Sequence, residues 1–67
     1  MPKVPHLAAH RERAGWTRKE LAHQAHMQET VVRRAESGGE IFASTIRDLA
    51  EALHVEPDDL TADGPAR

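Results

Sequence analysis

The chain has 67 residues, no cysteine and a formal net charge of −2 at neutral pH. This length allows one domain with one small core, which rarely contributes more than ~3–5 kcal/mol of stability. The lack of cysteine excludes disulfides and thiolate metal sites. No apolar run is long enough to cross a membrane, and no signal-peptide pattern is present, so we expect a soluble intracellular protein.

The charge is distributed unevenly along the chain. Residues 1–34 hold seven Lys and Arg against three acids, a net of +4. Residues 35–67 hold two Arg against eight acids, a net of −6. Such asymmetry indicates one face for an anionic partner and another face that is turned away from it.

The pattern of the first part of the chain predicts a loose arm over residues 1–5, followed by a helix. Apolar and polar residues over positions 7–14 alternate with helical periodicity, and Gly15 is suited to end that helix. Trp16 is expected to pack between helices.

A second helix is predicted to begin after Thr17. Thr17 with Glu20 three residues later is the signature of a capping box. This helix should end near Ala25, with His26 in the turn. A third helix is predicted from about residue 28 to residue 37.

The remaining elements follow from glycine, proline and apolar spacing. Gly38 and Gly39 end the third helix, and residues 39–43 form a loop. A fourth helix buries Ile46, Leu49, Ala50 and Leu53. A short fifth helix spans residues 57–60, and residues 62–67 are expected to be disordered.

The second and third helices, with the tight turn between them, indicate a helix-turn-helix unit. A small residue is needed where the two axes cross, and Ala22 occupies that position. Val32 and Ala35 are placed to bury one face of the third helix against the second. Its other face carries polar and basic side chains, the layout that places a helix in the major groove of DNA.

Four groups of residues resemble the lambda-repressor-like (Xre/Cro-type) helix-turn-helix family over residues 6–61. They are Leu7-x-x-x-Arg11, Ala14-Gly15-Trp16-Thr17-Arg18-x-x-Leu21-Ala22, Val32-x-x-Ala35-Glu36-x-Gly38 and Leu49-Ala50-x-Ala52-Leu53-x-Val55-x-Pro57-x-x-Leu60. The resemblance implies an all-α, compact five-helix domain that binds double-stranded DNA as a homodimer in the prokaryotic cytoplasm. His26 and His54 stand where the family usually has glycine, and His10 stands where it often has leucine.

The resemblance also implies a set of DNA contacts. Arg18 is expected to hold a phosphate. On the third helix, Gln28 suits adenine, and Arg33 or Arg34 suits guanine. Glu29 suits the amino group of cytosine, and Thr30 suits the methyl group of thymine. The complete expected DNA-binding set is Thr17, Arg18, Gln28, Glu29, Thr30, Arg33 and Arg34.

The predicted function is that of a sequence-specific transcriptional regulator, preferably a repressor. The alternative is a protein-interaction module such as the antitoxin of a toxin–antitoxin pair, which would suit the acidic C-terminal half. That half and the fifth helix are the expected dimer surface, with Leu60 and Val55 either as anchors or as part of the core. No metal is expected, because the histidine pairs at helical spacing lack further ligands. No catalytic residues or cofactor are expected, because no base is linked to a nucleophile and a pocket is not expected in so small a chain.

Overall fold

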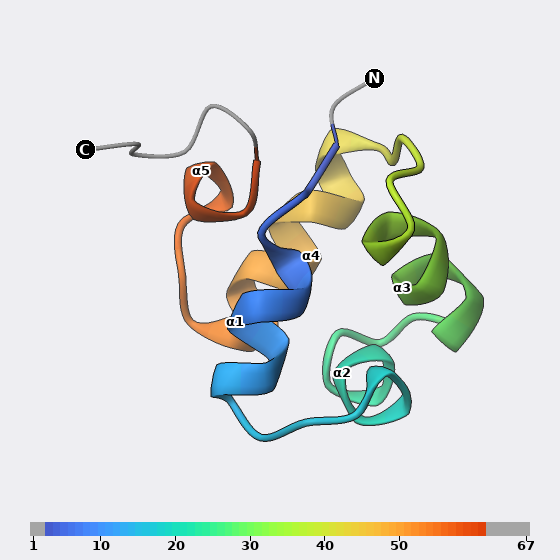
Figure 1. Cartoon of the computed structure of the whole chain (residues 1–67), viewed down its shortest axis with the longest axis vertical. Helices are drawn as coiled ribbons and strands as arrows, with labels where there is room; N and C mark the ends of the chain where they lie inside the picture. The colour runs from blue at the N-terminus through green and yellow to red at the C-terminus, as the bar shows by residue number, and fades with distance from the viewer. Residues whose placement is uncertain (1–2, 62–67) are drawn as a thin grey trace.

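The computed structural model describes residues 3–61, and all regular structure in this range is helical (Figure 1). The five helices are α1 (Leu7–Arg13), α2 (Arg18–Gln24), α3 (Glu29–Glu36), α4 (Ala43–Leu53) and α5 (Pro57–Leu60). The all-α, five-helix expectation is therefore confirmed. Among the described helices, none is long and apolar enough to cross a membrane. The tail predicted over residues 62–67 lies outside the described range, as do residues 1 and 2.

The helices pack around one aliphatic core. In Figure 1, α4 runs through the middle of the molecule, with α2 and α3 to one side and α5 to the other. The helix α2 packs against both α3 and α4, and α5 packs against α4. The core residues are Val4, Leu7, Leu21, Ala22, Ala25, Val32, Ala35, Ile41, Ile46, Leu49, Ala50 and Leu60.

Two core residues come from segments that the sequence pattern assigned to an arm and a loop. Val4 has only 1% of its surface exposed, and its carbonyl accepts a 3.0 Å hydrogen bond from the Leu7 N–H. The loose arm expected over residues 1–5 is therefore wrong at Val4. Ile41, in the loop before α4, is likewise buried. Burial of one such side chain contributes about 1.5–3 kcal/mol, which offsets part of the entropy lost when its segment is ordered.

Leu60 belongs to the core of the single chain. Its side chain has no exposed surface, and its carbonyl accepts a hydrogen bond from the His6 N–H at 3.3 Å. Of the two alternatives for Leu60, dimer anchor or core residue, the structure shows the core residue, because a side chain with no exposed surface offers no area to a second subunit. Val55 is partly buried against the same core.

The first four helices end in the same backbone motif. At the end of α2, the His26 N–H bonds to the His23 carbonyl at 3.2 Å, and the Met27 N–H bonds to the Ala22 carbonyl at 2.9 Å. This pair of bonds is the Schellman motif, which requires one residue in left-handed conformation. The left-handed residues are Gly15 (φ 80°), His26 (59°), Gly38 (94°) and His54 (60°). The two histidines thus take the backbone conformation that Gly15 and Gly38 take at the ends of α1 and α3.

Candidate nucleic-acid interface

The outer face of α3 is the centre of the candidate site. Val32 and Ala35 are buried, at 0% and 1% exposure, and they fix which side of the helix turns inward. The remaining polar side chains point away from the core: Gln28, Thr30, Arg33 and Arg34 are exposed, and Glu29 is half-buried. The structure therefore brings the residues predicted on this helix onto one accessible surface.

The start of α2 is held by the capping box that the sequence predicts. The Glu20 N–H donates to the Thr17 hydroxyl at 3.1 Å, and the Thr17 N–H donates to the Glu20 carboxylate at 2.8 Å. The Thr17 oxygen thus accepts a bond within the protein, while its own hydroxyl hydrogen can still be donated to an outside acceptor. Leu21 and Ala22 are buried one turn later and seat α2 in the core.

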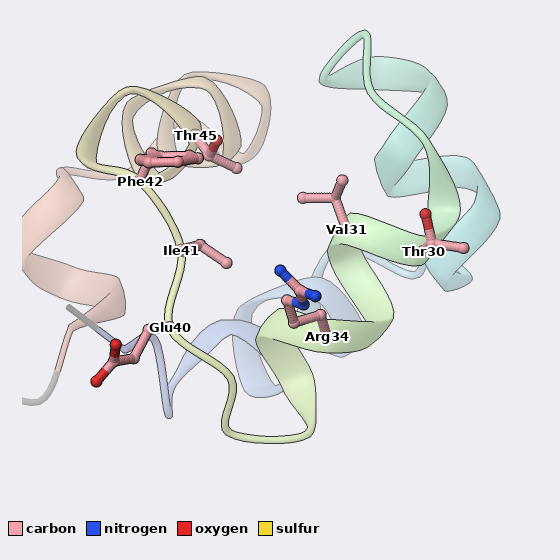
Figure 2. Close-up of a pocket in the computed structure, with 7 residues that line it drawn as sticks. All are labelled: Thr30, Val31, Arg34, Glu40, Ile41, Phe42 and Thr45. Carbon is pink, nitrogen blue, oxygen red and sulfur yellow. The ribbon is translucent and has the colours of Figure 1, made fainter. Parts of the chain in front are cut away.

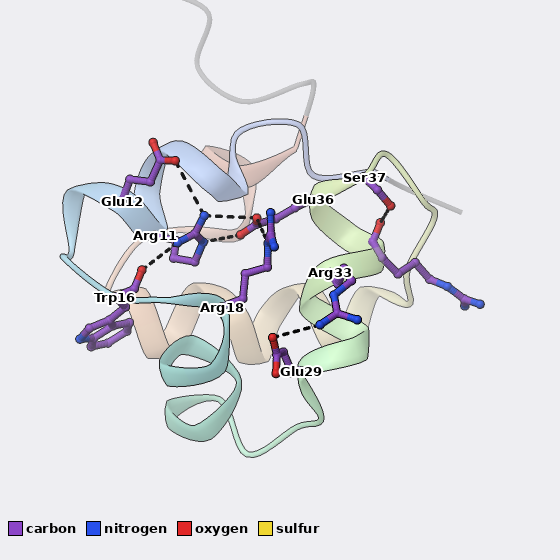
Figure 3. Close-up of polar contacts among 9 residues, drawn as sticks. Arg11, Glu12, Trp16, Arg18, Glu29, Arg33, Glu36 and Ser37 are labelled. Carbon is purple, nitrogen blue, oxygen red and sulfur yellow. Dashed lines mark hydrogen bonds and ion pairs between the residues drawn. The ribbon is translucent and has the colours of Figure 1, made fainter.

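Glu29 and Arg33 form an ion pair along the exposed side of α3 (Figure 3). The terminal nitrogen Nη2 of Arg33 lies 3.2 Å from Oε2 of Glu29, one helical turn away. The side chains are 61% and 39% exposed, so the pair adds little to stability. Its effect is on geometry, because Glu29 restricts where the Arg33 guanidinium can lie.

Arg34 lines a hollow between α3 and the start of α4 (Figure 2). The hollow has a volume of about 390 Å³ and is lined by Thr30, Val31, Arg34, Glu40, Ile41, Phe42 and Thr45. Phe42 is 64% exposed, and among the described residues it is the exposed large hydrophobic side chain. Sequence reasoning missed Phe42, since a lone aromatic residue in a loop carries no periodic signal for burial or exposure.

Glu36 joins the first three helices through two arginines (Figure 3). It accepts hydrogen bonds from Nε and Nη2 of Arg11 on α1 and, at 2.9 Å, from Nε of Arg18 on α2. Arg11 also donates to the Trp16 carbonyl at 2.8 Å, directly before α2 begins. The side chains of Arg11, Glu36 and Arg18 are 12%, 6% and 49% exposed.

These hydrogen bonds stabilise the ionised form of Glu36. Burial by itself raises the pKa of the Glu36 carboxyl, but the hydrogen bonds and positive charges of Arg11 and Arg18 outweigh it and hold the pKa below the usual 4.5. Glu36 is therefore ionised at neutral pH. The sequence contained Arg11, Arg18 and Glu36 within the family pattern but held no sign that the three residues meet.

A second hollow, of about 360 Å³, lies where α2 ends beside α4. It is lined by Gln24, Ala25, His26, Asp48, Glu51, Ala52 and His54. Within residues 3–61, no group of three or more His, Asp or Glu is arranged to hold a metal ion.

Comparison with known proteins agrees with this geometry. The sequence matches the family described as a helix-turn-helix domain over residues 6–63, which is most of the chain. The protein therefore belongs to this helix-turn-helix family, and its fold is of the lambda-repressor-like type. No curated protein sequence matches significantly.

Three solved structures show the likeness in three dimensions. A hypothetical transcription factor from Neisseria is 33% identical with a TM-score of 0.75, over 81% of this chain and 63% of its own. The restriction-modification controller protein C.AhdI from Aeromonas hydrophila is 28% identical with a TM-score of 0.79, over 84% of this chain and 86% of its own. The biofilm master regulator SinR, solved in complex with DNA, shares the fold at 17% identity, with a TM-score of 0.77 over 84% of this chain and 92% of its own.

Proposed function

We propose that this protein is a sequence-specific DNA-binding transcription regulator that inserts α3 into the major groove. The observation that carries the proposal is the outer face of α3, where four polar side chains are exposed while Val32 and Ala35 hold the helix to the core. Two similar proteins are described as a transcription factor and as a controller protein, which favours a regulator over an antitoxin-like interaction module.

The exposed residues of α3 divide into base-reading and positioning groups. Gln28 and Thr30 lie at the beginning of the helix, where side chains enter the groove deepest, and they would contact adenine and a thymine methyl group. Arg33 would read guanine through two parallel hydrogen bonds. Because Glu29 already accepts a bond from Arg33, we assign it to orienting that arginine as well as to contacting cytosine.

Thr17 and Arg18 would contact the backbone of DNA, whereas Arg34 would contact either a base or a phosphate. Arg18 and the Thr17 hydroxyl lie at the start of α2 and would bind phosphate beside the reading face, which is the outer face of α3 with Gln28, Thr30 and Arg33. Arg34 flanks the hollow next to Phe42 and would read guanine or hold a phosphate at the edge of the groove.

The protein would act as a homodimer in the cytoplasm and repress by occupying its operator. A two-fold dimer sets its recognition helices about 34 Å apart, which matches half-sites one helical turn apart. With Leu60 in the core, the proposed dimer surface consists of the exposed parts of α5 and the acidic C-terminal half, which stay away from the phosphates.

The direct test is selection of bound duplexes from a random pool. We expect a palindromic site whose affinity falls steeply between about 50 and 200 mM salt, as counterions are released from several phosphates. Undetectable binding to any duplex, even at low salt, would refute the proposal.

A substitution tests the assignment of α3. Arg33→Ala should cost about 1–3 kcal/mol of binding and relax the preference at a single base position. Arg47→Ala, at an exposed arginine on α4, is the matched control and should leave the base preference unchanged. An equal loss on all sequences would make Arg33 a phosphate contact.

A further inference from the structure

We infer that Glu36 is a positioning residue for DNA binding: its carboxylate holds Nε of Arg18, so that the two terminal amino groups of the same guanidinium can bind a phosphate. The inference rests on the proposed DNA-binding function. It assigns a role to a side chain that lies behind the reading face and would not itself contact DNA.

Glu36 is held rigidly by Arg11. Its side chain is only 6% exposed, and Arg11, itself 12% exposed, donates to it through two nitrogens. A third nitrogen of Arg11 bonds to the Trp16 carbonyl. The carboxylate is therefore fixed from the inner side, by α1 and by the segment that leads into α2.

The outer side of the same carboxylate is bound by Arg18. Arg18 is the first residue of α2 and its side chain is 49% exposed. Among the described residues, its contact with Glu36 uses Nε alone, at 2.9 Å. An arginine has five N–H donors in a planar fork, so four of them stay available after this bond is made.

Restricting Arg18 before DNA binds favours its contact with a phosphate. A long, exposed side chain loses rotamer freedom when it is immobilised by a ligand. Glu36 has already restricted Arg18 in the free protein, so less freedom remains to be lost on binding. Lysine would be a poorer residue here, because its single ammonium group would have to lie between the carboxylate and the phosphate, whereas the guanidinium group presents separate nitrogens to each.

The charge of Glu36 makes the inference sharply testable. Removing one negative charge near DNA raises affinity if long-range attraction is all that matters. Glutamine keeps one acceptor oxygen but turns N–H donors towards the two arginines, so it no longer holds Arg18 in place, which lowers affinity. Glu36→Gln therefore distinguishes the two effects by the sign of the change.

The experiment measures the affinity of the full chain for its selected duplex across a range of salt concentrations. Arg18→Ala should weaken binding about tenfold and reduce the salt dependence by about one phosphate contact. Arg18→Lys should weaken it about fivefold although the charge is unchanged. Arg47→Lys, the control for exchanging an exposed arginine, should bind as the wild type does.

A double-mutant cycle assigns the effect to Glu36. Glu36→Gln should weaken binding about fivefold in the wild type and less than about twofold in the Arg18→Ala background, because the positioned group is then gone. Equal losses in both backgrounds, or tighter binding by Glu36→Gln, would overturn the inference. Circular dichroism of each variant shows whether it is folded.

A measurement on the unmodified protein decides the question if Glu36→Gln fails to fold. In the nitrogen-15 NMR spectrum, the Nε–H signal of Arg18 should be protected from exchange in the free protein and should stay so when the duplex is added. Loss of that protection on binding would mean that Arg18 leaves Glu36, which overturns the inference. A wild type that binds no DNA would refute the proposed function itself, whereas wild-type affinity in Arg18→Lys refutes only the role of Glu36.

Discussion

The ends of α2 and α4 are predicted to be stabilised by replacing a histidine with glycine. Both helices end in the same Schellman motif as α1 and α3, but the left-handed residue is His26 or His54 where the other two have Gly15 and Gly38. Both histidine side chains are exposed. Little packing is therefore lost when either side chain is removed.

The expected gain follows from two opposing contributions. A left-handed backbone costs a non-glycine residue about 1–2 kcal/mol, towards the low end for histidine, which enters this region more readily than most residues. Glycine lowers the stability of the folded protein by about 0.4–1 kcal/mol, because it increases the conformational entropy of the unfolded chain. The net expectation for His26→Gly is a stabilisation of about 0.5 kcal/mol, which raises the melting temperature by about 2–4 °C in a domain of this size.

Urea denaturation and thermal melting measure this effect, with His23→Gly as the matched control. His23 is exposed and lies inside α2, where its backbone is helical. The same substitution there should destabilise by about 0.5 kcal/mol, because glycine is the poorer helix former. Stabilisation by His26→Gly together with destabilisation by His23→Gly would show that the left-handed backbone of His26 is strained. If His26→Gly destabilised the protein as much as His23→Gly, left-handed strain at His26 would be refuted.

Three further predictions concern Glu36, the core residue Leu60 and the close contact between Gly39 and Arg34. Because the pKa of Glu36 is lowered in the folded protein, its contribution to stability is present above about pH 4.5 and is lost as the pH falls through the folded-state pKa. In thermal melts, the stability difference between the wild type and Glu36→Gln should therefore shrink in acid, and a constant difference would contradict the assignment. Leu60→Ala should cost about 2–5 kcal/mol and largely unfold the chain in denaturation experiments, whereas a dimer anchor would lose association without unfolding. Gly39→Ala places a Cβ atom 2.5 Å from Cγ of Arg34, so chemical denaturation should show a loss of about 1–3 kcal/mol, and wild-type stability would mean that the Arg34 side chain moves aside freely.

Local signals in the sequence determined where α2 begins and where α1 and α3 end. The Thr17–Glu20 capping box forms between residues three apart, and each Schellman motif closes within six residues. Such bonds depend on the backbone of one short segment and not on the rest of the fold. The positive φ of His26 and His54 was indicated only by the family resemblance, in which both positions are usually glycine.

Helical periodicity determined which face of α3 is open. Val32 and Ala35 lie three residues apart, so one side of the helix turns inward and the predicted DNA-binding residues remain outside. Whether those residues contact DNA is a prediction that binding experiments must test. Their accessibility follows from the pattern of a single helix.

Only the tertiary structure decided which distant residues meet. Val4 and Ile41 join the core from segments outside the helices, because they pack against apolar side chains that are distant in the sequence. Glu36 meets Arg11 and Arg18 across 25 and 18 residues of chain, where no periodicity operates. Neighbours along a helix are set by its 3.6-residue turn, but neighbours across helices depend on how the whole chain packs, and a single sequence does not display that packing.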